Sequence, residues 1–194
     1  MRVHSAPDTA SLLLDVAKAT PASSLLVPMR NGHASRLELL LRQAPNIIGK
    51  MKVEISHCVK KPVSDSAIRK AISETLNLLN IKSEAALSVA LVGEKKMRSL
   101  NKVWRGKDSP TDVLSFSFLE SGNGDAEEIK EAGEIIICLS VAARQARLYG
   151  LSEKKHIARL AAHGTMHIFG LDHERSEREA RRMERIQKKV ADLI

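Results

Sequence analysis

Cysteine is scarce in this sequence: Cys58 and Cys138 are the only two among 194 residues, and no Cys-x-x-Cys pair occurs. A disulfide framework is therefore not indicated. Both cysteines stand beside apolar residues, so we expect two buried thiols. Buried thiols suit a reducing compartment, and we expect the protein to be cytoplasmic.

Aromatic residues and long apolar runs are also lacking. Trp104, Tyr149 and three phenylalanines make up 3% of the chain, which argues against a broad platform for stacking bases. No apolar run approaches the ~18 residues that cross a membrane. The N-terminus lacks a Lys/Arg-led start followed by a long apolar segment. We therefore expect neither a membrane span nor a secretory signal.

Acidic residues are outnumbered: 31 Lys and Arg stand against 23 Asp and Glu, a formal net charge of +8. Positive charge favours an anionic partner, nucleic acid first and a membrane surface second, although a merely soluble basic protein has the same balance. A chain of this length suits one domain with a core that needs no structural metal. Any bound metal is therefore expected to serve chemistry.

Residues 1–50 differ in composition from the remainder of the chain. They hold four of the six prolines and two short apolar stretches, SLLLDVA and RLELLLRQA. An amphipathic targeting peptide is one interpretation, and a natural start at Met51 is another. We expect a poorly ordered, dispensable extension at 1–50 and one folded domain at 51–194.

From Met51 onward the hydrophobic pattern changes between the periods of strands and helices. It predicts strands at 51–59, 86–93, 111–118 and 134–140, and a loop rich in glycine and acidic residues at 120–133. Helices are predicted at 64–80, 94–104, 141–150, 152–170 and 176–194, with Ser152 as one N-cap and Gly170 as a C-terminal stop. The predicted fold class is α+β: a small mixed β-sheet packed with helices.

The stretch HGTMHIFGLDH at 163–173 contains three histidines in the spacing H-x3-H-x5-H. His163 and His167 share one face of the predicted helix, and Gly170 lets the chain reverse so that His173 returns toward that face. Three neutral imidazoles leave a fourth coordination position open to water, as in catalytic zinc sites. The spacing predicts a zincin-like metal-binding helix with His163, His167 and His173 as the ligands.

The glutamate that zinc peptidases place directly after the first histidine is missing, and Gly164 stands there instead. This glycine removes the usual general base and is expected to clear space beside the metal. Both effects disfavour peptide hydrolysis. A metal-bound water can attack a phosphodiester if a cation stabilises the charge that develops on phosphorus.

Two residues near the histidines have more than one interpretation. His156, two helical turns before His163, is expected to be a packing or surface residue. Asp172 is expected either to orient a ligand imidazole or to cap the following helix.

A candidate for the stabilising cation lies in LNKVWRGKDSPTDVLSFSF at 100–118. Arg105, Lys107 and Asp108 occupy a polar loop before a predicted strand. An arginine placed there can bind a phosphate through two N–H groups. The alternative is an ordinary charged turn in which Arg105 and Asp108 pair with each other.

Together, the two stretches resemble the YbeY family of bacterial and organellar endoribonucleases, whose signatures read HGxLHLxGYDH and LNxxYRxKDxPTDVLSF. GEIIICLSVAARQA at 133–146 also resembles a strand–helix segment of that family, with Glu134 where an aspartate is usual. The resemblance covers residues 51–194.

The resemblance implies zinc-dependent endoribonuclease cleavage of single-stranded RNA, in maturation of the 3′ end of small-subunit (16S) ribosomal RNA and in ribosome quality control. RNA and the ribosomal small subunit are the implied partners. One Zn²⁺ would be held by His163, His167 and His173, although imidazole sites also accept nickel, copper or iron. Arg105 would be the catalytic residue at a phosphate. The general base is not identified, and the candidates are Asp108, Asp112, Glu134 and Asp172.

Two other functions stay open at this point. A metallopeptidase or another metallohydrolase would need a carboxylate within reach of the metal-bound water. A ribosome-assembly binding protein would use the metal structurally. The basic last helix, with interspersed glutamates, either adds an RNA-facing surface or forms a self-paired solvated face. The oligomeric state is left open.

Overall fold

The computed structural model describes residues 51–119 and 131–194, and the expectations for 1–50 and for the loop at 120–130 lie outside these ranges. The described elements follow one another as β1 (Val53–His57), α3 (Asp65–Leu79), β2 (Ala86–Val92), α4 (Glu94–Arg105), β3 (Val113–Ser117), β4 (Glu131–Cys138), α5 (Leu139–Leu148), α6 (Glu153–Ile168) and α7 (Glu177–Asp192). The predicted α+β class is confirmed.

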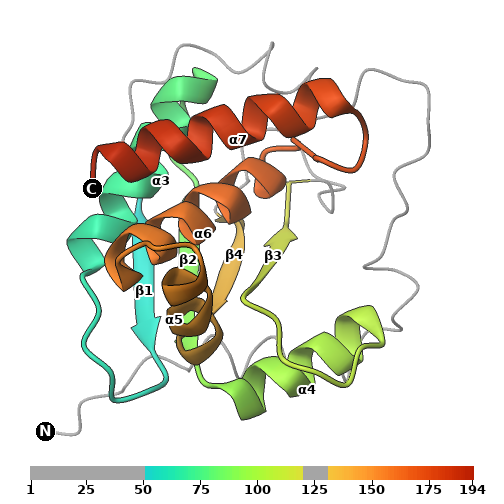
Figure 1. Cartoon of the computed structure of the whole chain (residues 1–194). Helices are drawn as coiled ribbons and strands as arrows, with labels where there is room; N and C mark the ends of the chain where they lie inside the picture. The colour runs from blue at the N-terminus through green and yellow to red at the C-terminus, as the bar shows by residue number, and fades with distance from the viewer. Residues whose placement is uncertain (1–50, 120–130) are drawn as a thin grey trace, which may run out of the picture.

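The strands form one mixed sheet in the order β1-β2-β4-β3, and α5 and α6 cross in front of it in Figure 1. β1, β2 and β4 run parallel, and β3 pairs antiparallel with β4. β4 begins at Glu131 rather than at the predicted Glu134. The glycine that suggested a loop is required in the strand, because a Cβ at Gly133 would collide with the backbone oxygen of Phe116 on β3.

Side chains of β4 alternate between two apolar cores, as strand geometry requires. Ile135 and Ile137 belong to the larger core, which also includes residues of α3, α6 and α7. Ile136 and Cys138 belong to the smaller core, which includes Trp104 of α4. The sheet is therefore covered on one face by α3, α5, α6 and α7 and on the other by α4, which lies at the bottom of Figure 1.

Helix α6 begins and ends where its sequence predicts. The Ser152 hydroxyl accepts a hydrogen bond from the Lys155 N–H at the first turn. At the other end Gly170 has φ +82°, and the N–H groups of Gly170 and Leu171 donate to the carbonyls of His167 and Met166. This is the left-handed helix stop that glycine allows.

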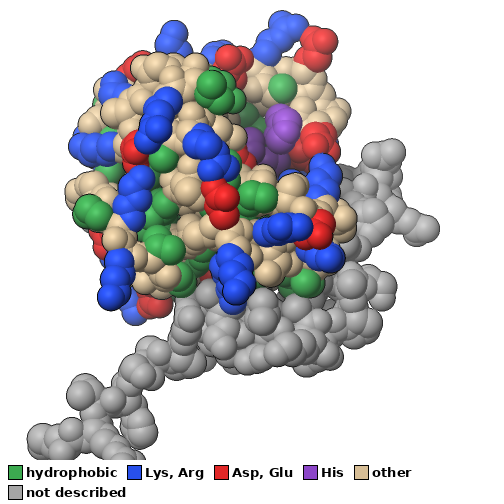
Figure 2. Space-filling model, turned by 60° about the horizontal axis from the view of Figure 1, so that its bottom comes forward, with side chains coloured by type: hydrophobic (Ala, Val, Ile, Leu, Met, Phe, Trp, Pro, Cys, Tyr) green, Lys and Arg blue, Asp and Glu red, His purple; other side chains and the backbone are tan. Residues whose placement is uncertain are grey.

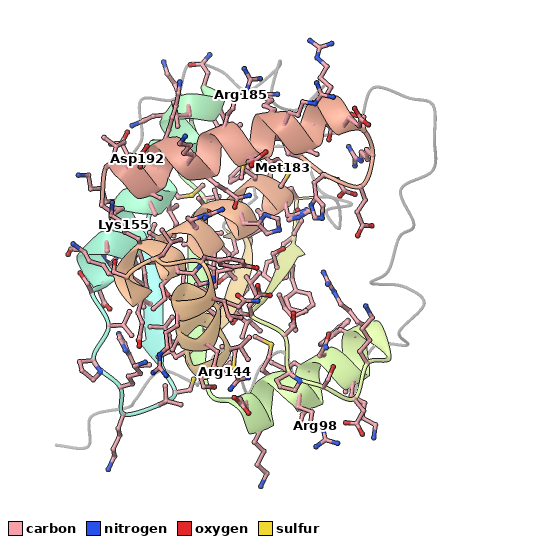
Figure 3. The ribbon with its side chains drawn as sticks, in the orientation of Figure 1. Arg98, Arg144, Lys155, Met183, Arg185 and Asp192 are labelled. Carbon is pink, nitrogen blue, oxygen red and sulfur yellow. The ribbon has the colours of Figure 1, made fainter. Side chains whose placement is uncertain are left out.

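The C-terminal helix α7 packs on α6 through an apolar face. Figure 3 shows Met183 pointing from α7 toward α6 and Arg185 pointing away, and Met183 is 1% exposed. The basic side chains of α7 lie on its outer side, where Arg181 pairs with Glu177 at 2.6 Å. This pair fits the self-paired interpretation of the outer face.

The prediction of two buried thiols is confirmed for one cysteine and wrong for the other. Cys138 is buried, as expected, but Cys58 is exposed, because it follows β1 immediately at the edge of the sheet. Within residues 51–119 and 131–194, no helix has the length and apolar character that a membrane crossing requires.

Candidate metal centre

The three histidines of the predicted motif lie together in the structure. His163 and His167 project from α6, and His173 projects from the loop that follows. One potential ligand atom from each lies within 4.8 Å of the other two, and the ring centroids are 4.6 to 5.3 Å apart. The spacing in the sequence therefore predicted the convergence correctly.

The loop that carries His173 is held by the start of α7. The Asp172 N–H donates to the Glu179 carboxylate at 2.9 Å, while the Glu179 N–H donates to the Ser176 hydroxyl at 3.2 Å. The Asp172 carboxylate accepts from the Glu174 N–H at 3.0 Å. Asp172 thus organises its own loop, and the cap of α7 is Ser176, so the expectation that Asp172 caps that helix is wrong.

Burial keeps the imidazoles of His163 and His167 neutral. It lowers the pKa of His163 to about 4, with further lowering by the neighbouring His167 and His173, and the Arg105 charge adds to the same effect. Burial also lowers the pKa of His167, against which the Asp172 carboxylate acts. A neutral imidazole has a lone pair for a metal ion, so both groups are in their binding form at neutral pH.

A side chain from α7 contacts the first of these imidazoles. Gln187 Nε2 lies 3.1 Å from His163 Nδ1. On the other side of the ring, His163 Nε2 lies 3.1 Å from His167 Nε2. The two ring nitrogens of His163 therefore face different partners, and Nε2 is the one directed into the cluster.

The donor set fits a metal ion. Two nitrogens bound at ~2.0–2.1 Å to one tetrahedral ion are about 3.3 Å apart, and the Nε2 atoms of His163 and His167 are 3.1 Å apart. Three imidazoles suit zinc and leave one coordination position for water. The same donors accept other first-row metals, so the arrangement defines a possible metal site without selecting the metal.

The three histidines line a cavity of about 480 Å³, within the range of ligand-binding pockets. Figure 2 shows histidine side chains gathered in a hollow, with many lysine and arginine side chains on the surrounding face. The other lining side chains come from α4, β3, α5, α6, α7 and the loops beside them, and they include Arg105, Asp112, Tyr149, Arg159 and Gln187.

Arg105 is the last residue of α4 and lines the same cavity as the histidines. The alternative in which it pairs with Asp108 is wrong, because Asp108 binds Arg98 at 2.8 Å and Lys102 at 3.2 Å. Hydrogen bonds from these two cations lower the pKa of Asp108 to about 2. Gly106, with φ +68°, ends the helix directly after Arg105. The structure thus brings together the two stretches that the sequence analysis selected.

The four carboxylates considered as general base separate into two groups. Asp112 and Asp172 line the cavity. Asp108 lies on the outer side of α4 with its two cations. Glu134 alternates on β4 with Ile135, which faces α6, so Glu134 points to the opposite face of the sheet, where it is 3% exposed. Asp108 and Glu134 are therefore removed as candidates.

Gly164 has a different role from the one expected. A Cβ at this position would lie 2.9 Å from Cγ2 of Ile135, so the missing side chain lets α6 approach β4. It does not clear space beside the histidines. A side chain at 164 would start toward the sheet, and no general base can be supplied from there.

The fold and the cavity define an α+β protein with a possible three-histidine metal site, an arrangement found in metal-dependent hydrolases. The family model described as Endoribonuclease YbeY matches residues 51–194. The chain therefore belongs to the YbeY family of endoribonucleases, and the resemblance seen in the sequence is confirmed.

Two relatives, both named endoribonuclease YbeY, agree with the family model. The chain is 36% identical over 134 residues to endoribonuclease YbeY of Persephonella marina, covering 69% of this chain and 86% of the relative. It is 38% identical over 146 residues to endoribonuclease YbeY of Geobacter sulfurreducens, covering 74% and 96%. The solution structure of TM1509 from Thermotoga maritima is 28% identical, with a TM-score of 0.49 and coverage of 72% of this chain and 87% of the other.

Proposed function

We propose that this protein is a zinc-dependent endoribonuclease that cleaves single-stranded RNA, with the 3′ end of small-subunit (16S) ribosomal RNA as its substrate. The ribosomal small subunit is the proposed partner, ribosome quality control the wider role, and the cytoplasm the proposed location. The observation that carries the proposal is one cavity lined by both the histidine cluster and Arg105. A phosphodiester entering this cavity meets potential metal ligands and a guanidinium together.

His163, His167 and His173 are the proposed ligands, and a bound zinc ion would supply a polarised water or a polarised phosphate oxygen. Arg105 is the proposed catalytic residue, because its guanidinium can donate two hydrogen bonds to the phosphate and stabilise the charge that develops there. Of the carboxylates considered as general base, Asp112 and Asp172 line the cavity and can accept a proton, and Glu174 lines it as well. Loss of a stabilising donor typically lowers the rate about 10²–10³-fold.

The decisive test is cleavage of a single-stranded RNA that carries a 16S 3′ end, with bound metal measured in every sample. We expect His167→Ala to lose metal and cleavage, and Arg105→Ala to keep metal but lose cleavage. Arg98→Ala is the matched control, because Arg98 lies on the same helix and pairs with Asp108 on the outer side. If metal-loaded wild type cleaves no RNA above a buffer control, the proposal is wrong.

The alternative functions have separate outcomes. A metallopeptidase would cleave a peptide library in the metal-loaded state, which the orientation of position 164 toward Ile135 argues against. A ribosome-assembly binding protein with a structural metal would unfold when chelated and would bind RNA without cutting it. Titrating a chelator while recording the far-UV spectrum and RNA cleavage separates this case from a catalytic metal.

We also propose that residues 1–50 are a dispensable extension of the domain at 51–194. The support is that the family model begins at residue 51. A chain starting at Met51 should unfold within a few degrees of the full chain and retain RNA cleavage. A large loss of either property would show that the extension belongs to the domain.

A further inference from the structure

The cavity continues along α6 beyond the histidine cluster. His156, Arg159 and Leu160 line it together with His163 and His167, a spacing that places all five on one helical face. His156 lies seven residues before His163, which is about 10 Å along a helix. The cavity therefore has room beside the proposed metal site for a group that the cleavage mechanism does not use.

Tyr149 stands at this second part of the cavity with its ring exposed. It is the chain's single tyrosine, it lines the cavity, and it is 62% exposed, whereas Trp104 and Phe169 are 8% and 4% exposed. Phe116 and Phe118 are partly buried against the core on the other face of the sheet. Of the Trp, Tyr and Phe rings, all of which lie within the described residues, this one is the most exposed to solvent.

The surroundings of Tyr149 hold its ring in place. Its centroid is 5.6 Å from the ring of His156, at an interplanar angle of 54°. His156 is 4% exposed and its Nε2 is 2.9 Å from the Gln145 side-chain oxygen. The Tyr149 N–H donates to the Gln145 carbonyl at 2.9 Å. An aromatic ring supported on one side and open on the other is a surface on which a base can stack.

Arg159 supplies a positive charge to the same part of the cavity. It lines the cavity. Burial is the largest cause of the lowered pKa of His156, and the positive charge of Arg159 is the second largest. Within residues 51–119 and 131–194, no ion pair joins Arg159 to a carboxylate. A partly buried guanidinium in a cavity, with no anion from the described chain, is suited to an anion of the substrate.

We propose that Tyr149 and Arg159 form a subsite for one nucleotide of single-stranded RNA next to the cleaved phosphodiester. The base stacks on the Tyr149 ring, and a phosphate contacts the Arg159 guanidinium. This subsite rests on the proposed endoribonuclease function and adds to it a contact that tolerates any base, since every base has a stacking face. The scarcity of aromatics excludes a broad platform but leaves room for one ring beside the site of cleavage.

The test measures RNA binding apart from cleavage. Fluorescent single-stranded oligoribonucleotides are titrated with His167→Ala protein, which cannot cut under the proposed function, and anisotropy is recorded. In this background we expect Tyr149→Ala to weaken binding about tenfold. Tyr149→Phe should stay within about twofold, because the ring is kept. Arg159→Ala should weaken binding about tenfold and reduce the slope of log K against log salt by about 1.

Neighbouring residues give matched controls. Leu148 is 82% exposed and Arg147 is exposed on the same helix, and neither lines the cavity. Leu148→Ala and Arg147→Ala should bind RNA as the parent does. A set of oligoribonucleotides, each with one abasic position at a different place in the strand, locates the stacked base. When the abasic position is that of the stacked base, Tyr149→Ala should cause no further loss of RNA affinity. At every other position it should weaken binding as it does for the intact strand.

The outcomes separate the subsite from the proposed function. If wild type cleaves RNA while Tyr149→Ala and Arg159→Ala bind as the parent does, the subsite is overturned and the endoribonuclease function stands. If Tyr149→Phe loses as much affinity as Tyr149→Ala, base stacking is overturned. If wild type neither binds nor cleaves RNA, both proposals fail together. Thermal unfolding of each variant confirms that the fold is intact.

Discussion

Gln187 Nε2 lies 3.1 Å from His163 Nδ1, which joins the C-terminal helix to the first imidazole of the candidate metal centre. The Gln187 amide can donate to Nδ1 through its nitrogen, or accept from Nδ1–H through its oxygen after a half-turn. Metal binding through His163 Nε2 requires the second arrangement, because Nδ1 then carries the proton. Partners of this kind fix the ring and the tautomer of a metal-binding histidine.

From this contact we predict that Gln187→Leu weakens zinc binding by about 10–100-fold. The leucine fills similar space but cannot accept from Nδ1–H, so the ring loses its orientation and its preferred tautomer. The measurement is competition with a chromophoric chelator at pH 7. Gln187→Glu provides a carboxylate acceptor and should bind zinc at least as tightly as wild type.

Lys188→Ala is the control for this prediction, since Lys188 is the next residue of α7 and is exposed. It should leave zinc affinity unchanged. Equal affinities for wild type and Gln187→Leu would mean that the contact has no part in metal binding.

A second prediction concerns the loop that carries His173. Glu179→Ala removes the acceptor of the Asp172 N–H, which lies 2.9 Å from the carboxylate, and should lower the free energy of unfolding by about 1 kcal/mol. Zinc affinity should fall as well, because the loop then samples other positions. Glu177→Ala is the control for the helix dipole: it removes an acidic residue from the same first turn, and its carboxylate binds exposed Arg181. Urea denaturation in which Glu177→Ala loses as much stability as Glu179→Ala would contradict the loop contact.

The sequence could predict those parts of the site that depend on local geometry. His163 and His167 share a helical face by their spacing, and Gly170 supplies the left-handed stop that returns His173, so the cluster followed from one short stretch. Gln187 could not be found in this way, because its contact with His163 depends on how α7 packs on α6. The sequence does contain one signal: Gln187 is a polar residue directly after Ile186 on the apolar face of α7.

Two features of β4 depend on packing between distant segments, which the local sequence does not reveal. Glu134 remained a candidate base because nothing local reveals which face of β4 it occupies, and the face was settled only by the packing of Ile135 against α6. The sequence predicts a loop at Gly133 because glycine and acidic residues usually mark one. In the sheet, the same glycine permits the close approach of β3. The order of the strands likewise depends on contacts between distant segments.

A third prediction follows from the burial of His163, which lowers its pKa from 6.5 to about 4. The unfolded chain takes up a proton at this residue below pH ~6.5 while the folded protein does not. The neutral ring therefore makes its full contribution to the free energy of unfolding above pH ~6.5. This contribution is lost as the pH falls toward 4, and the full loss is about 3 kcal/mol. Urea midpoints of the metal-free protein between pH 8 and pH 4 measure this loss.

The comparison variant for the pH series is His163→Asn, which cannot titrate and should lose less stability over the same interval. Identical pH profiles for wild type and His163→Asn would show that this ring does not contribute.

The last prediction concerns the glycine that replaces the peptidase glutamate. Gly164→Ala introduces a Cβ 2.9 Å from Cγ2 of Ile135, a residue that is 0% exposed. Alanine gains about 1 kcal/mol of helix propensity over glycine, but overpacking of a core costs about 1–3 kcal/mol. We expect a net loss of about 1 kcal/mol in the free energy of unfolding.

A double-mutant cycle separates the two effects. Ile135→Ala removes the atoms that the new Cβ would meet, and by itself should cost about 2–5 kcal/mol. In that background Gly164→Ala should stabilise the protein by up to about 1 kcal/mol, because only the gain in helix propensity remains. If Gly164→Ala has the same effect with and without the Ile135 side chain, the close approach of α6 to β4 does not explain the glycine. The same packing predicts that Gly164→Glu destabilises the sheet interface and creates no peptidase, since its side chain starts toward Ile135.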